Sequence, residues 1–111
     1  MPDLCTIETR QTDRHTVVRV IGEVDASNAA SIDEELRAIA RTARNVFVID
    51  LNALDYIDSA GIAALERLAR ETGCKIVVAD DATVYQTLNI VRFNAGQELY
   101  ESLADALSSS A

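Results

Sequence analysis

The chain has 111 residues, a formal net charge of -8, and a composition in which 49% of the residues are hydrophobic and 25% are charged. This balance is typical of one globular domain that buries a core without metal or disulfides, and it disfavours a disordered chain. The negative charge disfavours nucleic acid and anionic membranes as ligands. No apolar run approaches the roughly 18 residues of a membrane helix, and the first residues show no leader pattern. We therefore expect a cytoplasmic protein without nucleic-acid or membrane partners.

The first half of the chain predicts a β-hairpin, a helix and a buried strand. Strands are expected at residues 4–9 and 16–24 around a turn at 11–14, followed by a helix at 27–43 and a strand at 46–49. Apolar residues at helical spacing indicate the helix, and Asp25, Ser27 and Asn28 are the candidates for its N-cap. The unbroken apolar run at 46–49 is typical of a central strand that is covered on both faces.

The second half of the chain alternates helices with strands. The expected elements are a loop at 50–58, a helix from about Ser59 to Thr72, a strand at 75–79, a helix at 83–91, an edge strand at 99–100 and a last short helix. Gly73 is placed to end the longer helix, and Ser102 with Asp105 resembles a capping box for the last one. We expect a single domain over residues 1–111, with a frayed tail at 108–111.

This order of elements predicts an α/β fold. The opening hairpin and the later strand–helix–strand units together give a mixed β-sheet of about four to five strands with about four α-helices. In such sheets, functional sites gather beyond the carboxyl ends of the parallel strands. The loop at 50–59 is expected to lie there.

The residues for the common catalytic routes are scarce. His15 is the only histidine and falls in the first hairpin, so a Ser-His-Asp site is not expected. A hydrolase with paired carboxylates would have to use Asp50, Asp55 and Asp58, but acidic loop residues more often form turns and caps. The sequence thus gives little support for an enzyme.

Cofactor and metal motifs are also missing from the sequence. The four glycines form neither a Walker A loop nor a dinucleotide fingerprint. Cys5 and Cys74 form no CxxC motif, and each reads as a small buried side chain. A thiol switch between these two cysteines stays open, while no metal or cofactor is expected.

Ser59 stands out because it falls at the junction of a loop and a helix. The free N–H groups of a first helical turn favour an anion there, and the small residues Ala60 and Gly61 leave the serine accessible to another protein. The simpler interpretation is that Ser59 is a plain N-cap, worth on the order of 1 kcal/mol. Helix physics alone favours that interpretation.

Two short motifs favour a functional role for Ser59 over that of a plain N-cap. Residues 58–61 read Asp-Ser-Ala-Gly after a buried strand, and residues 22–25 read Gly-Glu-Val-Asp before the first long helix. Together with the ending at 99–107, they resemble the STAS domain family, and more narrowly its bacterial anti-sigma-factor antagonists. The resemblance spans nearly the whole chain, in order and with fitting spacing.

The resemblance implies a switch in which this chain is acted upon. Ser59 matches the serine that is phosphorylated by a partner which is both a serine kinase and an anti-sigma factor. The unphosphorylated protein would bind that partner and release a sigma factor for transcription, and a phosphatase would reset the switch. The residues expected around the phosphorylation site are Glu23, Asp25, Ser27, Asp58, Ala60 and Gly61.

Some features limit the resemblance, and one rival remains. Ala60 replaces the serine or threonine of many relatives, so a second phosphate there is excluded, and residues 88–94 depart from the usual threonine-glycine-leucine pattern. The helix start near Ser59 is also suited to a small anionic ligand or nucleotide. A STAS module that binds such a ligand is therefore the alternative, and a transporter-associated domain is disfavoured because no membrane segment is visible.

Overall fold

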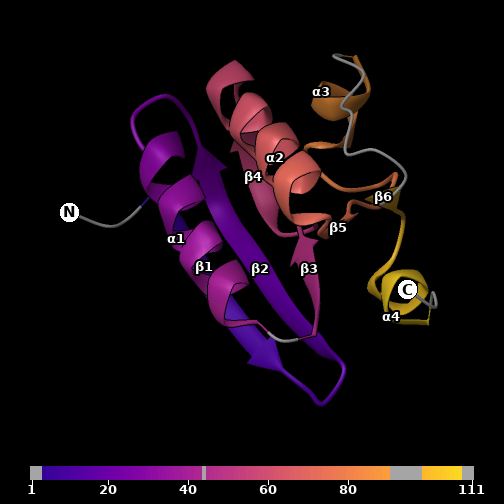
Figure 1. Cartoon of the computed structure of the whole chain (residues 1–111). Helices are drawn as coiled ribbons and strands as arrows, with labels where there is room; N and C mark the ends of the chain where they lie inside the picture. The colour runs from indigo at the N-terminus through magenta and orange to yellow at the C-terminus, as the bar shows by residue number, and fades with distance from the viewer. Residues whose placement is uncertain (1–3, 44, 91–98, 109–111) are drawn as a thin grey trace.

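The computed structural model describes residues 4–43, 45–90 and 99–108, which form a mixed sheet covered by helices (Figure 1). The strands are β1 (Cys5–Gln11), β2 (His15–Val24), β3 (Val46–Asp50), β4 (Leu54–Ile57), β5 (Lys75–Val77) and β6 (Leu99–Tyr100). The helices are α1 (Ala29–Thr42), α2 (Ser59–Thr72), α3 (Tyr85–Ile90) and α4 (Leu103–Ser108). The predicted α/β fold is confirmed, with six strands among the described residues.

The sheet begins with an antiparallel pair and continues in parallel. Its order is β1-β2-β3-β5-β6, and only the β1–β2 pair is antiparallel among these neighbours. The short strand β4 lies off this path and pairs in parallel with the end of β2, with a shift in register between Gly22 and Glu23. The carboxyl ends of β2 and β4 therefore meet directly before α1 and α2 begin.

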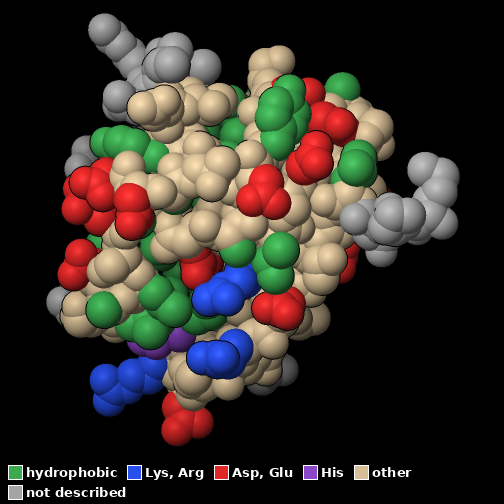
Figure 2. Space-filling view, turned by 180° about the vertical axis from the view of Figure 1, so that it is seen from behind, with side chains coloured by type: hydrophobic (Ala, Val, Ile, Leu, Met, Phe, Trp, Pro, Cys, Tyr) green, Lys and Arg blue, Asp and Glu red, His purple; other side chains and the backbone are tan. Residues whose placement is uncertain are grey.

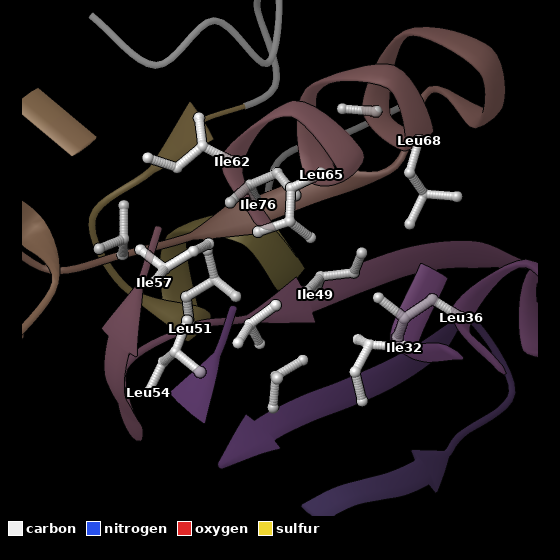
Figure 3. Close-up of a cluster of buried hydrophobic side chains, with 14 of the residues drawn as sticks. Ile32, Leu36, Ile49, Leu51, Leu54, Ile57, Ile62, Leu65, Leu68 and Ile76 are labelled. Atoms are coloured by element: carbon white, nitrogen blue, oxygen red, sulfur yellow. The ribbon is translucent and has the colours of Figure 1, made fainter. Parts of the chain in front are cut away.

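The main core lies between the sheet and the helices α1 and α2. Strand residues such as Val20 and Ile49 pack in one cluster with Leu36 of α1 and Leu65 of α2. Figure 3 shows how Leu36, Ile49 and Leu65 converge. A smaller cluster on the opposite face holds Val48 and Val77 under Ala106 of α4. β3 is buried on both sides because its alternate residues enter the two clusters, as its apolar run predicts.

Several predicted boundaries are confirmed. α2 spans Ser59–Thr72 and ends at Gly73, whose φ of 67° is the left-handed conformation of a glycine C-cap. The edge strand β6 is present, and the Asp105 N–H donates to Ser102 Oγ at 3.1 Å, as one half of the expected capping box. Ser108 ends α4, while residues 91–98 and 109–111 lie outside the described residues.

Other predictions need correction. Residues 54–57 form β4 instead of a loop, because the end of β2 is free to accept a short parallel strand. β5 ends at Val77, earlier than the expected end at 79, and beyond it the Ala79 N–H donates to Asn52 Oδ1 at 2.7 Å instead of to a strand. The first strand extends to Gln11, because its pairing with β2 continues to Thr16. None of the helices described here is long and apolar enough to cross a membrane.

Candidate functional site

The start of α2 is fixed by Asp58. Asp58 is the N-cap, and its Oδ1 accepts the N–H of Gly61, the third helical residue, at 3.1 Å. Its Oδ2 accepts the N–H of Ala26 at 3.0 Å, and its own N–H donates to the carbonyl of Val24 at 3.1 Å. One aspartate thus joins the two motifs that lie far apart in the sequence.

The segment between β2 and α1 is a turn with its own hydrogen bonds. Asp25 Oδ1 accepts from Ser27 Oγ at 2.5 Å and from the Ser27 N–H at 2.8 Å. Asn28 is the N-cap residue of α1, yet its side chain does not cap that helix. Instead, Asn28 accepts the Asp25 N–H at 2.9 Å and donates to the Glu23 carbonyl at 2.9 Å. Of the three predicted caps, Asn28 therefore holds the position, while Asp25 and Ser27 build the turn.

The two motif glycines allow the close packing of this region. A Cβ at Gly61 would lie 2.8 Å from side-chain carbons of Val24 and Ile57, so α2 approaches the ends of β2 and β4 more closely than alanine permits. Gly22 has a φ of 109°, and a Cβ there would lie 2.3 Å from the carbonyl oxygen of Leu4. Glycine is required at both positions, for close approach in one case and for conformation in the other.

Ser59 is the first residue of α2 and is exposed. The simpler interpretation of Ser59 as an N-cap is wrong, because Asp58 takes that role. The Ser59 hydroxyl makes no hydrogen bond within the described part of the chain. Ala60 beside it is half-buried and packs against the core, so it gives the helix start a small neighbour without covering the serine.

The surroundings of Ser59 are acidic. Asp25 and Asp58 are both half-exposed, and Asp58 accepts the N–H of Ala26, the residue after Asp25. Glu23 and Asp55 are exposed on the adjoining strands. Hydrogen bonds from the Ser27 hydroxyl, and secondarily from the Ser27 N–H, hold the pKa of Asp25 below its ordinary value. This carboxylate is therefore kept ionised.

Tyr56 is a further candidate residue that the sequence pattern did not single out. It is 49% exposed, which is high for a large aromatic side chain, and it lies opposite Glu23 in the pairing of β4 with β2. The sequence pattern predicts a loop at residues 54–57, and an exposed tyrosine in a loop gives no indication of a binding surface. Only the pairing of β4 shows that Tyr56 is held on a rigid strand two residues before Asp58.

The other candidate residues are engaged elsewhere. His15 starts β2, at the end of the strand opposite to the site. Asp50 is buried, accepts the Asn52 N–H at 2.9 Å, and lies 3.7 Å from Arg19 Nε. Within the described residues, no group of three or more histidine, cysteine or acidic side chains is arranged to hold a metal ion.

The two cysteines are both free thiols. Cys74 is buried, and Cys5 is half-buried at the start of β1. Burial is the main cause that raises the pKa of the Cys5 thiol. Burial of Cys74 agrees with its predicted role as a small core side chain.

The comparison with known families decides the identity of the domain. The model of the STAS domain matches residues 6–106, which is nearly the whole chain. The chain belongs to the STAS family. The two motif segments that Asp58 joins both lie inside the matched region.

Relatives of this STAS domain are regulatory proteins. It is 24% identical over 110 residues to the anti-sigma-F factor antagonist RsfB of Mycobacterium tuberculosis, covering 96% of this chain and 90% of the relative. It is similar to the crystal structure of an anti-sigma factor antagonist from Mycobacterium paratuberculosis, with a TM-score of 0.80, 28% identity, and coverage of 97% and 95% of the two chains. It shares its fold with phosphorylated SpoIIAA of Bacillus, at a TM-score of 0.60 and 15% identity over 92% and 96% of the two chains.

Proposed function

We propose that this STAS domain is an anti-sigma-factor antagonist whose binding state is set by phosphorylation of Ser59. The relatives from the two mycobacteria carry the antagonist name over nearly the full length of the chain. The observation that carries the phosphorylation proposal is the exposed hydroxyl of Ser59, the first residue of α2. Asp58 caps this helix, so the Ser59 hydroxyl is not used as the cap. In this proposal the chain is a cytoplasmic substrate and binding partner, not an enzyme.

A kinase can reach Ser59 without unfolding the domain. The hydroxyl has no internal hydrogen bond to break among the described residues, and the following residues are alanine and glycine. The cap that holds α2 uses the Asp58 side chain, so modification of Ser59 leaves the hydrogen bonds of Asp58 intact. We therefore expect the phosphorylated and unphosphorylated forms to share one fold.

The phosphate would act at the interface with the partner. It adds about -1.5 to -2 charges at pH 7 to a helix start whose adjoining turn carries Asp25 and whose cap is Asp58. Moving a binding equilibrium from 1:99 to 99:1 needs about 5.5 kcal/mol, and an unpaired charge buried at an interface costs 2–5 kcal/mol or more. The proposed switch is therefore within the range that one phosphate supplies, through charge and bulk together.

The same geometry disfavours a free anionic ligand as the main function. The Asp58 carboxylate already takes the Gly61 N–H that an anion at the helix start would use. A diffusible anion would also have to approach the Asp25 and Asp58 carboxylates without a covalent bond to hold it there. A phosphate that is transferred to Ser59 does not face that binding penalty, because the kinase reaction supplies the free energy.

The proposed footprint for the anti-sigma factor centres on Ser59 and includes Tyr56. Exposed aromatic residues on rigid elements are frequent anchors of protein interfaces. The turn at 22–28 lies on one side of Ser59, and the exposed Arg67 and Arg70 of α2 lie farther along the helix. A partner that is both a serine kinase and an anti-sigma factor would cover this surface, and a phosphatase would later require the same access.

The site assignment is tested with the cognate anti-sigma kinase and ATP. Mass spectrometry should find one phosphate on the wild type, located at Ser59, and none on Ser59→Ala. Ser27→Ala removes the hydroxyl in the neighbouring turn and should still be phosphorylated. Phosphate that persists in Ser59→Ala would refute the assignment.

The partner is tested by a pull-down from the native cell with unmodified protein. We expect the wild type to recover a kinase-like anti-sigma factor, and the phosphorylated protein to recover at least about tenfold less. Tyr56→Ala should weaken binding of the purified partner, while Asp13→Ala in the distant hairpin turn should not. Equal recovery by the two phosphorylation states would contradict the switch. Saturable binding of GTP or inorganic phosphate to Ser59→Ala would instead support the rival ligand-binding function.

A further inference from the structure

β1 is an edge strand with a free side. Among the residues that the structure describes, β1 pairs only with β2. The Glu23 N–H donates to the Leu4 carbonyl, and the Thr12 N–H donates to the His15 carbonyl, each at 2.8 Å. Because hydrogen-bonded pairs alternate along an antiparallel ladder, the even-numbered residues of β1 bond to β2. The odd-numbered residues, with Thr9 in the middle of the exposed part, therefore direct their backbone groups to the free edge.

A row of alternating charges leads to this edge on the sheet face opposite α1 and α2. Asp50 of β3 lies beside Arg19 of β2, and Arg19 lies opposite Glu8 of β1. Figure 2 shows this face, where Lys and Arg side chains gather in its lower half next to acidic ones. The row runs from the negative Asp50 through the positive Arg19 to the negative Glu8 and ends at the free edge. A positive charge would continue it.

Arg10 supplies that charge in a second copy of the chain. Glu8 and Arg10 are exposed, lie two residues apart on the same face, and make no ion pair with any of the described residues. If two β1 edges pair in antiparallel fashion about Thr9, Glu8 of each copy lies opposite Arg10 of the other. That register also places the outward backbone groups of Thr9 against each other, as a hydrogen-bonded pair requires.

Neighbouring registers lack this match. A shift of the two-fold axis to Glu8 places two glutamates opposite each other, and a shift to Arg10 places two arginines opposite each other. Directly opposed like charges destabilise a sheet, whereas opposite charges stabilise it. Edge strands are often protected by charges that repel a second strand. Glu8 and Arg10 have opposite signs, so they favour one register of pairing with a second β1 strand and do not repel that strand in every register.

We propose that two copies of this chain associate through their β1 edges, in the antiparallel register centred on Thr9. The pairing makes one continuous sheet across the dimer and leaves the proposed phosphorylation site accessible. Thr9 lies opposite Val18, and Val24 at the site is six residues farther along β2, a distance of about 20 Å. The inference does not depend on the function of Ser59.

The test measures the dimer dissociation constant by analytical ultracentrifugation at physiological salt, with protein up to about 1 mM. We expect a reversible wild-type dimer. Arg10→Glu should weaken it by about tenfold or more, since both cross-strand pairs become repulsive. Thr9→Pro should abolish it, because proline removes an N–H that faces the free edge and is tolerated on edge strands. Thermal melting shows whether each variant is folded.

A mixture of two variants gives the decisive control. Glu8→Arg and Arg10→Glu should each dimerise poorly alone, but their mixture restores both opposite-charge pairs and should form a heterodimer. Asp13→Lys, which changes charge in the hairpin turn outside the paired strand, should leave the dimer within about threefold of the wild type. A wild type that stays monomeric over the whole range, or a mixture that is no tighter than its components, would overturn the proposal.

Discussion

The Asp58 carboxylate accepts the N–H of Ala26, a residue 32 positions earlier in the chain, at 3.0 Å. Its other oxygen caps α2 through the Gly61 N–H. The turn after β2 and the start of α2 are therefore held by one side chain. Because Asp58 caps α2, Ser59 is not the cap, and the turn that Asp58 contacts holds Asp25, whose carboxylate accepts from Ser27 within that turn.

Two replacements of Asp58 should reduce the stability of the protein to different extents. Asp58→Ala removes the cap and leaves two N–H groups without their acceptor, so we expect a loss of about 1–2 kcal/mol in the free energy of unfolding. Asp58→Asn should lose less, because its carbonyl oxygen still caps the helix while its amide no longer accepts from Ala26. Urea denaturation measures both. Asp55→Ala is the matched control, since Asp55 is exposed and outside the cap, and an equal loss there would contradict the assigned role.

Gly61→Ala tests the close approach of α2 to the sheet. In an open helical position this change would stabilise the protein by up to about 1 kcal/mol. Here the new Cβ would lie 2.8 Å from Val24 and Ile57, so we expect a loss of about 1–3 kcal/mol in the free energy of unfolding. Denaturant unfolding decides between these signs. Unchanged or increased stability would show that α2 has room for a methyl group.

Ser27 should control the acidity of Asp25. Ser27→Ala removes the hydroxyl hydrogen bond that is the main cause of the lowered pKa, so the pKa of Asp25 should rise toward its ordinary value of 3.8. NMR titration of the Asp25 carboxyl carbon measures this. Ser31→Ala on the exposed side of α1 is the control and should leave the titration unchanged.

The same shift predicts a dependence of stability on pH. Because the folded pKa of Asp25 is lower than the unfolded one, its contribution is fully present above the ordinary value of 3.8. It is lost as the pH falls from there through the lowered folded pKa. Wild type and Ser27→Ala should therefore differ more in melting temperature at neutral pH than at a pH below both values. A difference that is independent of pH would indicate that the serine acts without Asp25.

Lys75 should anchor α4 to the sheet. This lysine is only 4% exposed, donates to the Ala106 carbonyl at 3.0 Å, and lies 5.3 Å from the centre of the Tyr100 ring. Lys75→Met keeps the bulk but leaves that carbonyl without its donor, at a cost of about 1–3 kcal/mol. Hydrogen exchange should show faster exchange in α4, with α1 unchanged. Uniform loss of protection in both helices would indicate a role in the whole core instead.

The sequence by itself determined the elements whose signal is local. The period of apolar residues predicted α2, Gly73 marked its end, and the apolar run at 46–49 predicted a strand buried on both faces. These features depend on residues that are close in sequence and on local backbone conformation, so each can be predicted from a single segment of the chain. The two motifs also pointed to the family and to Ser59 before any contact was known.

Only the tertiary structure decided how the site is assembled. Asp58 and Ser59 are both good N-cap residues, and which one caps α2 depends on the Ala26 N–H that folding brings to Asp58. Tyr56 lies on β4 because the end of β2 offers a partner, and no local pattern encodes that pairing. Long-range hydrogen bonds and strand pairing join segments that are remote in sequence, and so the free hydroxyl of Ser59 follows from the fold.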